Sequence, residues 1–324
     1  MKRILSAVLI AVAACQLPLA QAQTWPSKPL RLVVAYPAGG GTDLVARIVA
    51  QRLSEQLKQA VVVDNRAGGS GSIGADLVAK AAPDGYTLLL AASSELVVGP
   101  AAGQKTPYHP ETDFVPVALA GETPLVLVTH PSTPGKDLAS FLAYAKTNPG
   151  KLSYGTPGNG SSMQFAGESL QGDLGISILH VPYRGAAPML NDLLGNQIPM
   201  GIVGMPPVVP HAKSGKLRVL AVTTSKRSTL MPNVPTLSEL PGMGDYRFSN
   251  WMAVFAPAGT PAPVVERLGA EIAAMMQEPA TRERLLAAGV EPLGLVGKEF
   301  ENFLAAERKR YANVARKRGI KFED

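Results

Sequence analysis

One stretch of the chain, residues 36–43 with the sequence Tyr-Pro-Ala-Gly-Gly-Gly-Thr-Asp, restricts the possible fold more than any other. It follows an apolar run at 30–35 and precedes a run at 44–57 whose apolar residues recur at helical spacing. A strand that ends in a glycine-rich turn and continues into a helix leaves backbone N–H groups unpaired at the start of the helix. The stretch therefore predicts a strand, a turn and a helix whose N-terminus can bind an anion.

A second stretch has the same design. A short strand at 151–155 runs into a turn of glycines and hydroxyl residues that ends at Ser162, and a helical run follows at 163–170. The two turns lie about a third of the chain apart, so they predict two lobes that face one another across a ligand.

Strand and helix patterns alternate along the rest of the chain, and this alternation predicts an α/β fold with mainly parallel sheets. Extended runs at 117–120 and 125–129 lead into the second lobe, and a strand at 216–223 begins the return. We therefore expect two crossing strands between the lobes. Lobe 1 is expected to contain residues 23–121 and about 222–324, and lobe 2 residues from about 122 to 221.

The first residues have the pattern of an export signal. Lys2 and Arg3 precede an apolar run at 4–14, and Ala20-Gln21-Ala22 forms an A-x-A cleavage site. The apolar run is too short for a permanent membrane anchor, so residues 1–22 are expected to be a signal peptide. A competing interpretation is lipoprotein processing at Cys15, after the loosely lipobox-like Val12-Ala13-Ala14.

Cleavage after Ala22 removes the only cysteine, so the mature chain would have no disulfide, thiol nucleophile or Cys-ligated metal. It also removes Lys2 and Arg3, which lowers the formal net charge from +6 to +4. A mildly basic exported chain without basic runs interleaved with aromatic residues is a poor candidate for nucleic-acid binding. The small positive balance suits an anionic small ligand.

The motifs of several enzyme classes are missing. Neither glycine turn has the G-x-S-x-G register of a nucleophile elbow, and the four histidines have no metal-binding spacing. The first turn also lacks both the P-loop lysine and the G-x-G-x-x-G pattern of nucleotide sites. Asp43 is open to two interpretations, a general base or a cap of the new helix. We expect no catalytic residue, cofactor or metal.

The turns do support capture of a carboxylate. Backbone N–H groups at two helix starts can hold its oxygens, and glycines allow the backbone to approach closely. Hydroxyl groups near both turns can add hydrogen bonds; they belong to Thr42, Ser93, Thr156, Ser161 and Ser162. Ser93 and Ser94 follow the strand at 86–91, which places them at the carboxyl end of that strand, on the side of the first glycine turn.

A series of motifs in order resembles the Bug family, the TctC-type solute receptors of tripartite tricarboxylate transporters. The resemblance covers essentially the whole mature chain. The motifs are Trp25-Pro26, residues 36–43, Val63 to Gly71, Pro83-Asp84-Gly85-Tyr86-Thr87-Leu88, residues 154–162, His180-Val181-Pro182-Tyr183-Arg184-Gly185, Asn233-Val234-Pro235-Thr236 and Phe255 to Pro261.

The resemblance implies a periplasmic binding protein of type II, a receptor that closes on a small organic carboxylate and delivers it to membrane permease subunits. In that family the two glycine turns hold one carboxylate of the ligand. Carried onto matching positions, this implies contacts from Tyr36, Ala38, Gly40, Thr42 and Asp43 in lobe 1, and from Thr156, Gly158, Asn159, Ser161 and Ser162 in lobe 2. Arg184 either pairs with a distal carboxylate or packs against the hinge.

The chain departs from the family pattern at two places. Gln164 stands where members often carry a histidine, and the stretch at 196–204 lacks their acidic residues. A less charged far side of the pocket makes a monocarboxylate or aromatic acid as plausible as a di- or tricarboxylate. Two other functions stay open, an exported hydrolase with Asp43 as base and a ligand-sensing partner of a membrane kinase. A monomer is expected.

Overall fold

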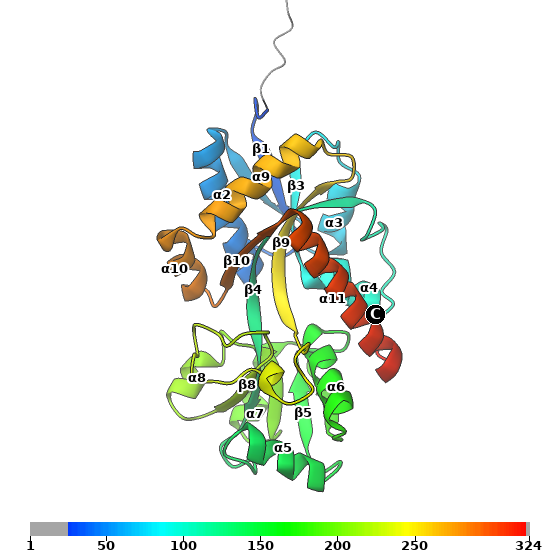
Figure 1. The fold of residues 1–324 in the computed structure, drawn as a ribbon, viewed down its shortest axis with the longest axis vertical. Coiled ribbons are helices and arrows are strands. Elements are labelled where there is room, and N and C mark those ends of the chain that lie inside the picture. The colour runs from blue at the N-terminus through cyan, green and yellow to red at the C-terminus, as the bar shows by residue number, and fades with distance from the viewer. Residues whose placement is uncertain (1–24, 322–324) are drawn as a thin grey trace, which may run out of the picture.

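One long strand, β4 (Phe114–Thr129), runs through the whole molecule and joins two lobes, called here upper and lower after their places in Figure 1. β9 (Ser249–Pro257) pairs antiparallel with it from the junction into the upper lobe. The two extended runs expected at 117–120 and 125–129 are parts of this one strand, because the residues between them also pair with β9. The computed structural model describes residues 25–321; the expected signal peptide and Cys15 lie outside the described residues.

The sheet of the upper lobe has the strand order β2-β1-β3-β9-β4. β1 (Leu30–Val34) pairs in parallel with β2 (Val61–Asn65) and β3 (Thr87–Ala92), whereas β9 is antiparallel to both of its neighbours. β10 (Glu291–Val296) pairs antiparallel with β4. Parallel pairing thus holds at the outer part of the sheet, and antiparallel pairing holds around the crossing strands.

Helices cover both faces of this sheet because its strands are apolar on both sides. Leu88 and Leu90 belong to the core on one face, with residues of α2 and α9, whereas Leu89 and Ala91 belong to the core on the other face, with residues of α3 and α11. The helical segments of the upper lobe are α2 (Gly41–Leu57), η1 (Gly69–Gly71), α3 (Ser72–Ala79), η2 (Ser94–Val98), α4 (Gly99–Ala101), α9 (Ala262–Met275), α10 (Pro279–Ala287) and α11 (Gly297–Arg318).

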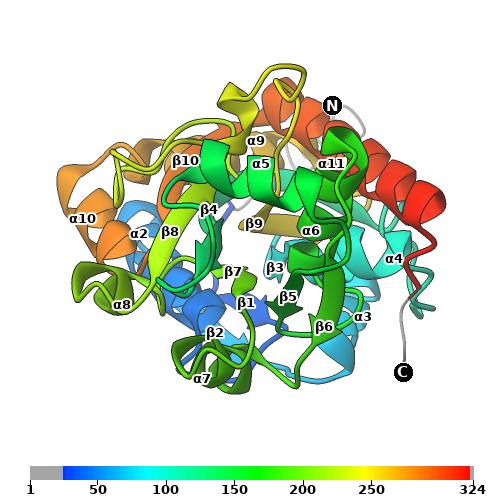
Figure 2. The same ribbon diagram turned by 90° about the horizontal axis from the view of Figure 1, so that it is seen from below.

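The lower lobe repeats this arrangement around the second half of β4. β5 (Ser153–Thr156) pairs in parallel with β6 (Leu179–Pro182) and β7 (Met200–Gly204), and β4 is antiparallel to β7 and β8 (Arg218–Val222). The helical segments are α5 (Leu138–Thr147), α6 (Ser162–Leu174), α7 (Ala186–Leu194), α8 (Val209–Lys213) and η3 (Leu237–Glu239). Viewed from below, α6 and α7 lie on opposite sides of the strands (Figure 2).

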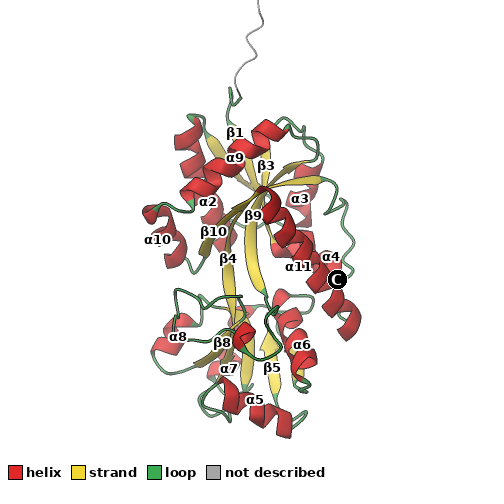
Figure 3. Ribbon diagram, in the orientation of Figure 1, coloured by secondary structure: helices red, strands yellow, loops and turns green. Residues whose placement is uncertain are grey.

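The last helix, α11, connects the lobes a second time. It begins on the upper lobe and descends beside α6 of the lower lobe (Figure 3). The ring of Tyr311 lies 5.0 Å from that of Phe165 on α6 and 5.4 Å from that of Phe248. Arg318 Nε donates to Glu168 Oε2 at 2.8 Å. One apolar core therefore continues from the upper into the lower lobe along α11.

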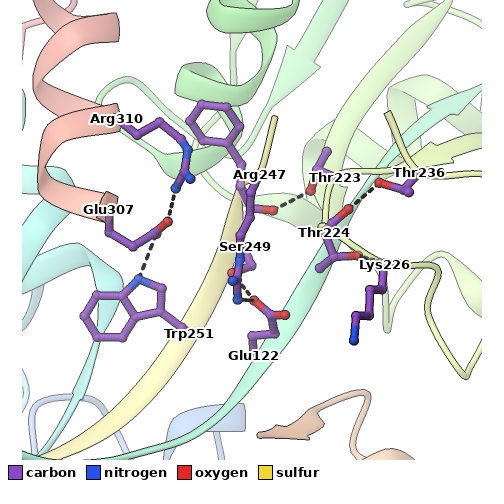
Figure 4. A network of polar contacts seen from close by, with 11 residues as sticks. Glu122, Thr223, Thr224, Lys226, Thr236, Arg247, Ser249, Trp251, Glu307 and Arg310 are labelled. Atoms are coloured by element: carbon purple, nitrogen blue, oxygen red, sulfur yellow. Dashed lines mark hydrogen bonds and ion pairs between the residues drawn. The ribbon is translucent and has the colours of Figure 1, made fainter. Parts of the chain in front are cut away.

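Buried charges hold the junction together (Figure 4). Glu122 of β4 accepts hydrogen bonds from Arg247 Nη2 at 2.8 Å and from Ser249 Oγ at 2.6 Å. Glu307 of α11 accepts from Trp251 Nε1 at 3.1 Å and pairs with Arg310. Trp251 is fully buried, and its ring belongs to the apolar core. Burial raises the pKa of Glu307.

Most expected elements have observed counterparts whose ends differ by a few residues. The elements that were not expected are the strand β10 and the short helical segments η1, η2, α4, α8 and η3. The expected lobe boundary at residue 121 falls inside the continuous strand β4, so the lobe limits remain a prediction. Within residues 25–321, no helix combines the length and the apolar character needed to cross a membrane.

Candidate functional site

The carboxyl ends of the parallel strands in the upper lobe are directed toward the junction. Val34 at the end of β1 lies beside Leu90 of β3, and Ala92 at the end of β3 lies opposite Met252 of β9. Residues that follow these strands, including Tyr36 and Ser93, therefore emerge near the first residues of β9.

The lower lobe directs its strand ends toward the same place. β7 is antiparallel to β4 and ends at Gly204, opposite Leu125 next to the junction, and β5 runs parallel to β7. The turn after β5 leads into α6, where Ser162 Oγ donates to Asn250 Oδ1 of β9 at 2.6 Å. Asn250 is thus the point at which the second turn reaches the crossing strand β9.

The first turn has an open backbone. Gly39 has a φ of +86°, a left-handed conformation that favours glycine, and Gly40 is the N-cap of α2 without a side-chain cap. Ala38, Gly39 and Gly40 are exposed and Thr42 is half-buried. The first N–H groups of α2 are consequently left without intrahelical partners at an exposed turn.

Asp43 stabilises this turn through hydrogen bonds to its buried carboxylate. Its buried carboxylate accepts hydrogen bonds from the Gly39 N–H at 2.9 Å, from Arg47 Nε at 2.8 Å and from Asn65 Nδ2 at 2.9 Å. Burial alone would raise its pKa, but the hydrogen bond from Arg47, with those from Gly39 and Asn65, lowers the pKa to about 2. Asp43 is therefore ionised and a very weak base near neutral pH, which removes the sequence argument for a hydrolase.

Asn65 is a positioning residue that the sequence analysis missed. Its Nδ2 donates to Tyr36 O at 3.0 Å as well as to Asp43 Oδ1, so it fixes the start and end of the turn. Its place at the carboxyl end of β2 was the available signal, because that end lies at the same edge as the turn.

Tyr36 faces a buried acid. Its hydroxyl donates to Glu95 Oε2 at 2.7 Å, and the Ala92 N–H donates to Glu95 Oε1 at 2.8 Å. Glu95 is 1% exposed, and its burial raises its pKa to about 7 despite the two hydrogen bonds. The pKa of Tyr36 is raised by burial and then by the charge of Glu95.

The two serines after β3 differ from each other. Ser93 is fully buried, and its Oγ has no hydrogen-bond partner within residues 25–321. Ser94 is half-buried and begins the π-helical turn η2. A buried hydroxyl without a hydrogen-bond partner destabilises the fold unless a ligand or a water binds it. The Oγ of Ser93 is therefore a polar atom at this edge of the sheet that needs a further partner.

The second turn is organised by its hydroxyl groups. Thr156 Oγ1 is buried and lies 2.7 Å from His180 Nε2. Ser161 is the N-cap of α6; its Oγ accepts from the Gln164 N–H and donates to Gly158 O at 2.7 Å. The hydroxyl groups of Thr156 and Ser161 therefore shape the turn, while α6 directs its free N–H groups out of it.

Two predicted contacts on the side of the second turn lie at the surface, as Ala38 and Gly40 do on the side of the first. Asn159 and Arg184 are both exposed. Arg184 lies beside the second turn, because the Tyr183 N–H donates to Thr156 O and the Gly185 N–H donates to Pro157 O. In the described part of the chain, no three His, Cys, Asp or Glu side chains are placed to hold a metal ion.

A cavity of about 630 Å³ lies elsewhere, between α6, α11 and the 242–248 segment. Its lining mixes acidic side chains such as Glu168 with basic ones such as Lys317, and none of the predicted ligand contacts lines it. The convergence of the strand ends, and not this cavity, identifies the candidate site.

The chain matches a known family and several known proteins. The family model described as "Tripartite tricarboxylate transporter family receptor" matches residues 45–320. The protein BugT of Bordetella pertussis is 40% identical over 317 residues, which are 98% of this chain and 97% of that relative.

Solved structures agree with this match. A Rhodopseudomonas palustris protein described as Rpa4515 with adipate is 36% identical, with a TM-score of 0.75, and the match covers 92% of this chain and 99% of the other. MatC (Rpa3494) from the same species, described with bound malate, is 30% identical, with a TM-score of 0.68 and coverage of 90% and 99%. The fold is that of the periplasmic binding proteins.

Proposed function

Because this chain belongs to the TctC family of tripartite tricarboxylate transporter receptors, we propose that it binds a small organic carboxylate at the junction of its lobes and delivers it to membrane permease subunits. It is a solute receptor of the periplasmic type, in a family whose structural neighbours are receptors and not enzymes. The observation that carries the proposal is that the strand ends of both lobes are directed toward the junction, where Ser162 of the second turn bonds to Asn250 of β9.

The proposed contacts differ in kind. Backbone groups of the first turn and the N-terminus of α6 bind the carboxylate oxygens, and hydroxyl groups add hydrogen bonds. Asp43 acts as a positioning residue, since three donors already occupy its carboxylate. The proposed ligand contacts are Tyr36, Ala38, Gly40, Thr42, Ser93, Ser94, Thr156, Gly158, Asn159, Ser161 and Ser162.

Ser93 supports a polar ligand at this place. Its buried Oγ lacks a partner within the described residues, and native proteins usually pair such atoms. A carboxylate oxygen, or a water that bridges to it, would satisfy the hydroxyl.

The relatives described with adipate and malate make a dicarboxylate the first ligand to test. One cation that could reach a distal carboxylate is Arg184, which is exposed beside the second turn. We propose that Arg184 contributes to specificity at the far end of the ligand. Replacing Arg184 should therefore weaken the binding of dicarboxylates more than the binding of monocarboxylates.

The remaining proposals concern the whole receptor. We propose export to the periplasm with cleavage after Ala22, lobes with limits near 121 and 222, closure of the lobes around the ligand, and action as a monomer. Closure stabilises binding only to the extent that the ligand contacts the closed state more favourably than the open one.

A thermal-shift screen of residues 23–324 tests the binding function. The protein is unfolded and refolded to remove bound ligand, and it is then heated with adipate, malate, citrate, glutarate or benzoate. A ligand at about 100 times its Kd adds roughly 2.7 kcal/mol, which raises Tm by several degrees. No shift with a broad panel of acids would contradict the proposal.

A variant then tests the location. Ser162→Ala removes the bond to Asn250 and a hydroxyl at the start of α6, so calorimetry should give a Kd about tenfold higher. Ser169→Ala is the matched control on the same helix, because its exposed hydroxyl bonds only Asp173 among the described residues. Equal affinities of both variants and wild type would place the ligand elsewhere.

A further inference from the structure

Glu95 is a buried acid beside a proposed ligand contact, and the proposed function gives it no role. It lies in the turn η2, directly after β3, and is 1% exposed. A carboxyl group buried without a cation is costly in its charged form. No ion pair found among residues 25–321 includes Glu95.

Only neutral donors contact its two oxygens. Oε1 accepts the Ala92 N–H at 2.8 Å, and Oε2 lies 2.7 Å from the hydroxyl of Tyr36. The side chain is also confined, because a Cβ added to Gly71 would lie 2.9 Å from Glu95 Cδ. The carboxyl group therefore has little room to move away from Tyr36.

The elements packed around Glu95 bring no cation to it. Tyr108 donates to the backbone carbonyl of Glu95 at 2.8 Å, and Asp76, whose charge acts on Tyr108, pairs with Lys80. η1 presents glycine backbone and α4 has no titratable side chain.

The helix α11, which also packs on η2, carries two buried titratable groups, Glu307 and Tyr311, and the half-buried Arg308, whose Nη2 donates to Pro110 O at 3.0 Å. Glu307 is paired with Arg310, and Tyr311 is neutral near pH 7 because burial raises its pKa. Tyr36 is thus the titratable side chain that shares a hydrogen bond with the Glu95 carboxyl group.

The direction of that hydrogen bond depends on one proton. An ionised carboxylate only accepts, so the Tyr36 O–H must then donate to Glu95. A neutral carboxyl group carries its own O–H, which can donate to the Tyr36 oxygen. The Tyr36 hydroxyl, which also shares a hydrogen bond with the Ser94 side chain, can then turn its O–H to another acceptor.

We propose that the proton on Glu95 decides whether Tyr36 can donate its hydroxyl to the bound carboxylate, so that the receptor takes up ligand and proton together. This inference rests on the proposed function, because Tyr36 must contact the ligand. Glu95 acts through Tyr36 and is a positioning residue.

The electrostatics agree with this arrangement. Burial raises the pKa of Glu95 to about 7, so both protonation states are populated in the physiological range. An anion bound nearby would favour the neutral form further. If only the neutral form binds fully, the Kd should rise about tenfold between pH 6 and pH 8, since one unit of pH above the pKa changes the neutral fraction about tenfold.

Calorimetry at pH 6, 7 and 8 with adipate, or with an acid that shifts Tm in the screen, tests the coupling. Glu95→Gln mimics the neutral acid, because its amide can donate to the Tyr36 oxygen. We expect wild type to lose affinity with rising pH and to take up protons, as measured in buffers of different ionisation enthalpy. Glu95→Gln should keep its affinity at pH 8 and take up no proton.

Tyr36→Phe is the second variant. It should bind about tenfold more weakly at pH 6, with no dependence on the Glu95 proton. The pKa of His180 is lowered by burial, and any contribution of His180 to the pH dependence of binding would persist in Glu95→Gln. A pH dependence in Glu95→Gln equal to that of wild type, or unchanged binding by Tyr36→Phe at pH 6, would overturn the inference.

A measurement without ligand separates this inference from the proposed function. Carbon-13 spectra of glutamate-labelled and tyrosine-labelled protein should show one carboxyl signal that titrates near pH 7 and is missing in Glu95→Gln. The Tyr36 ring signal should follow the same titration. Without that titration the inference fails even if carboxylates bind; if no acid binds, the proposed function itself fails.

Discussion

Two buried acids of the upper lobe show how local donors decide the charge of a residue. Asp43 has a guanidinium donor and two N–H donors, and its pKa falls to about 2. Glu95 has neutral donors only, and burial raises its pKa to about 7. The same functional group is thus a fixed anion in one turn and a titrating group in the next.

Asp43→Asn should destabilise the protein by about 1–3 kcal/mol at pH 7, because it removes the acceptor of three donors. The folded pKa lies below the unfolded value, so the stabilisation by the charged group is present above about pH 4 and is lost as pH falls toward 2. Urea unfolding of wild type and Asp43→Asn at several pH values measures the difference in their free energies of unfolding. A difference that stays constant down to pH 2 would contradict the assigned network.

The stability difference between wild type and Glu95→Gln should depend on pH in the opposite direction to that of Asp43→Asn. The folded pKa lies above the unfolded value, so the neutral group stabilises at low pH and that stabilisation is lost as pH rises from about 4.5 through 7. Relative to the variant, wild type should lose on the order of 3 kcal/mol of unfolding free energy between pH 4 and pH 8. Parallel stability curves of the two proteins over this range would show that Glu95 is not buried as described.

At the scale of elements, the predictions from the sequence worked where local patterns decide the structure. Apolar runs and glycine turns located β1, α2, β5 and α6, because each pattern is completed within a few residues. β10 was missed because its sequence, Glu-Pro-Leu-Gly-Leu-Val, contains both strand breakers. It forms because β4 offers it a neighbouring edge, with an irregular register between Pro292 and Leu295.

The candidate site was predictable to the same degree. Sequence reasoning proposed Tyr36 and Ser162 as ligand contacts, which stays a prediction, and it could not name their observed partners Glu95 and Asn250, which lie 59 and 88 residues away along the chain. A single sequence contains no signal for such pairs. Only the strand order brings them together.

Gly74 tests how closely α3 packs on the end of β1. A Cβ at this position would lie 2.8 Å from Ala35 Cα and 3.0 Å from Arg66 O, both backbone atoms that cannot move aside easily. Gly74→Ala should therefore cost about 1–3 kcal/mol in spite of the better helix propensity of alanine. Chemical denaturation measures the change.

Gly244→Ala is the matched control, because nothing lies within 4 Å of the added Cβ and its φ is ordinary for any residue. Its stability should stay within about 0.5 kcal/mol of wild type. An equal loss in both variants would mean that the packing of α3 on β1 is not responsible.

At the scale of the molecule, Tyr311 links the lobes through its ring and not its hydroxyl. The ring packs against Phe165 and Phe248, whereas Oη is buried and has no hydrogen-bond partner within residues 25–321. Tyr311→Ala should cost about 3–5 kcal/mol, and Tyr311→Phe should be neutral or slightly stabilising. Calorimetric unfolding compares them; a large loss in Tyr311→Phe would reveal a polar partner of the hydroxyl.

The position of β9 in the strand order has a consequence for how the protein is made. β9 lies between β3 and β4, so the strands of the first 129 residues cannot close the upper sheet by themselves. While the chain emerges from a ribosome or a translocation channel, β3 and β4 keep unpaired edges until residues 249–257 arrive. The newly made N-terminal part is therefore open to aggregation from the emergence of residue 129 until that of residue 249, and a chaperone that covers strand edges would act in this interval.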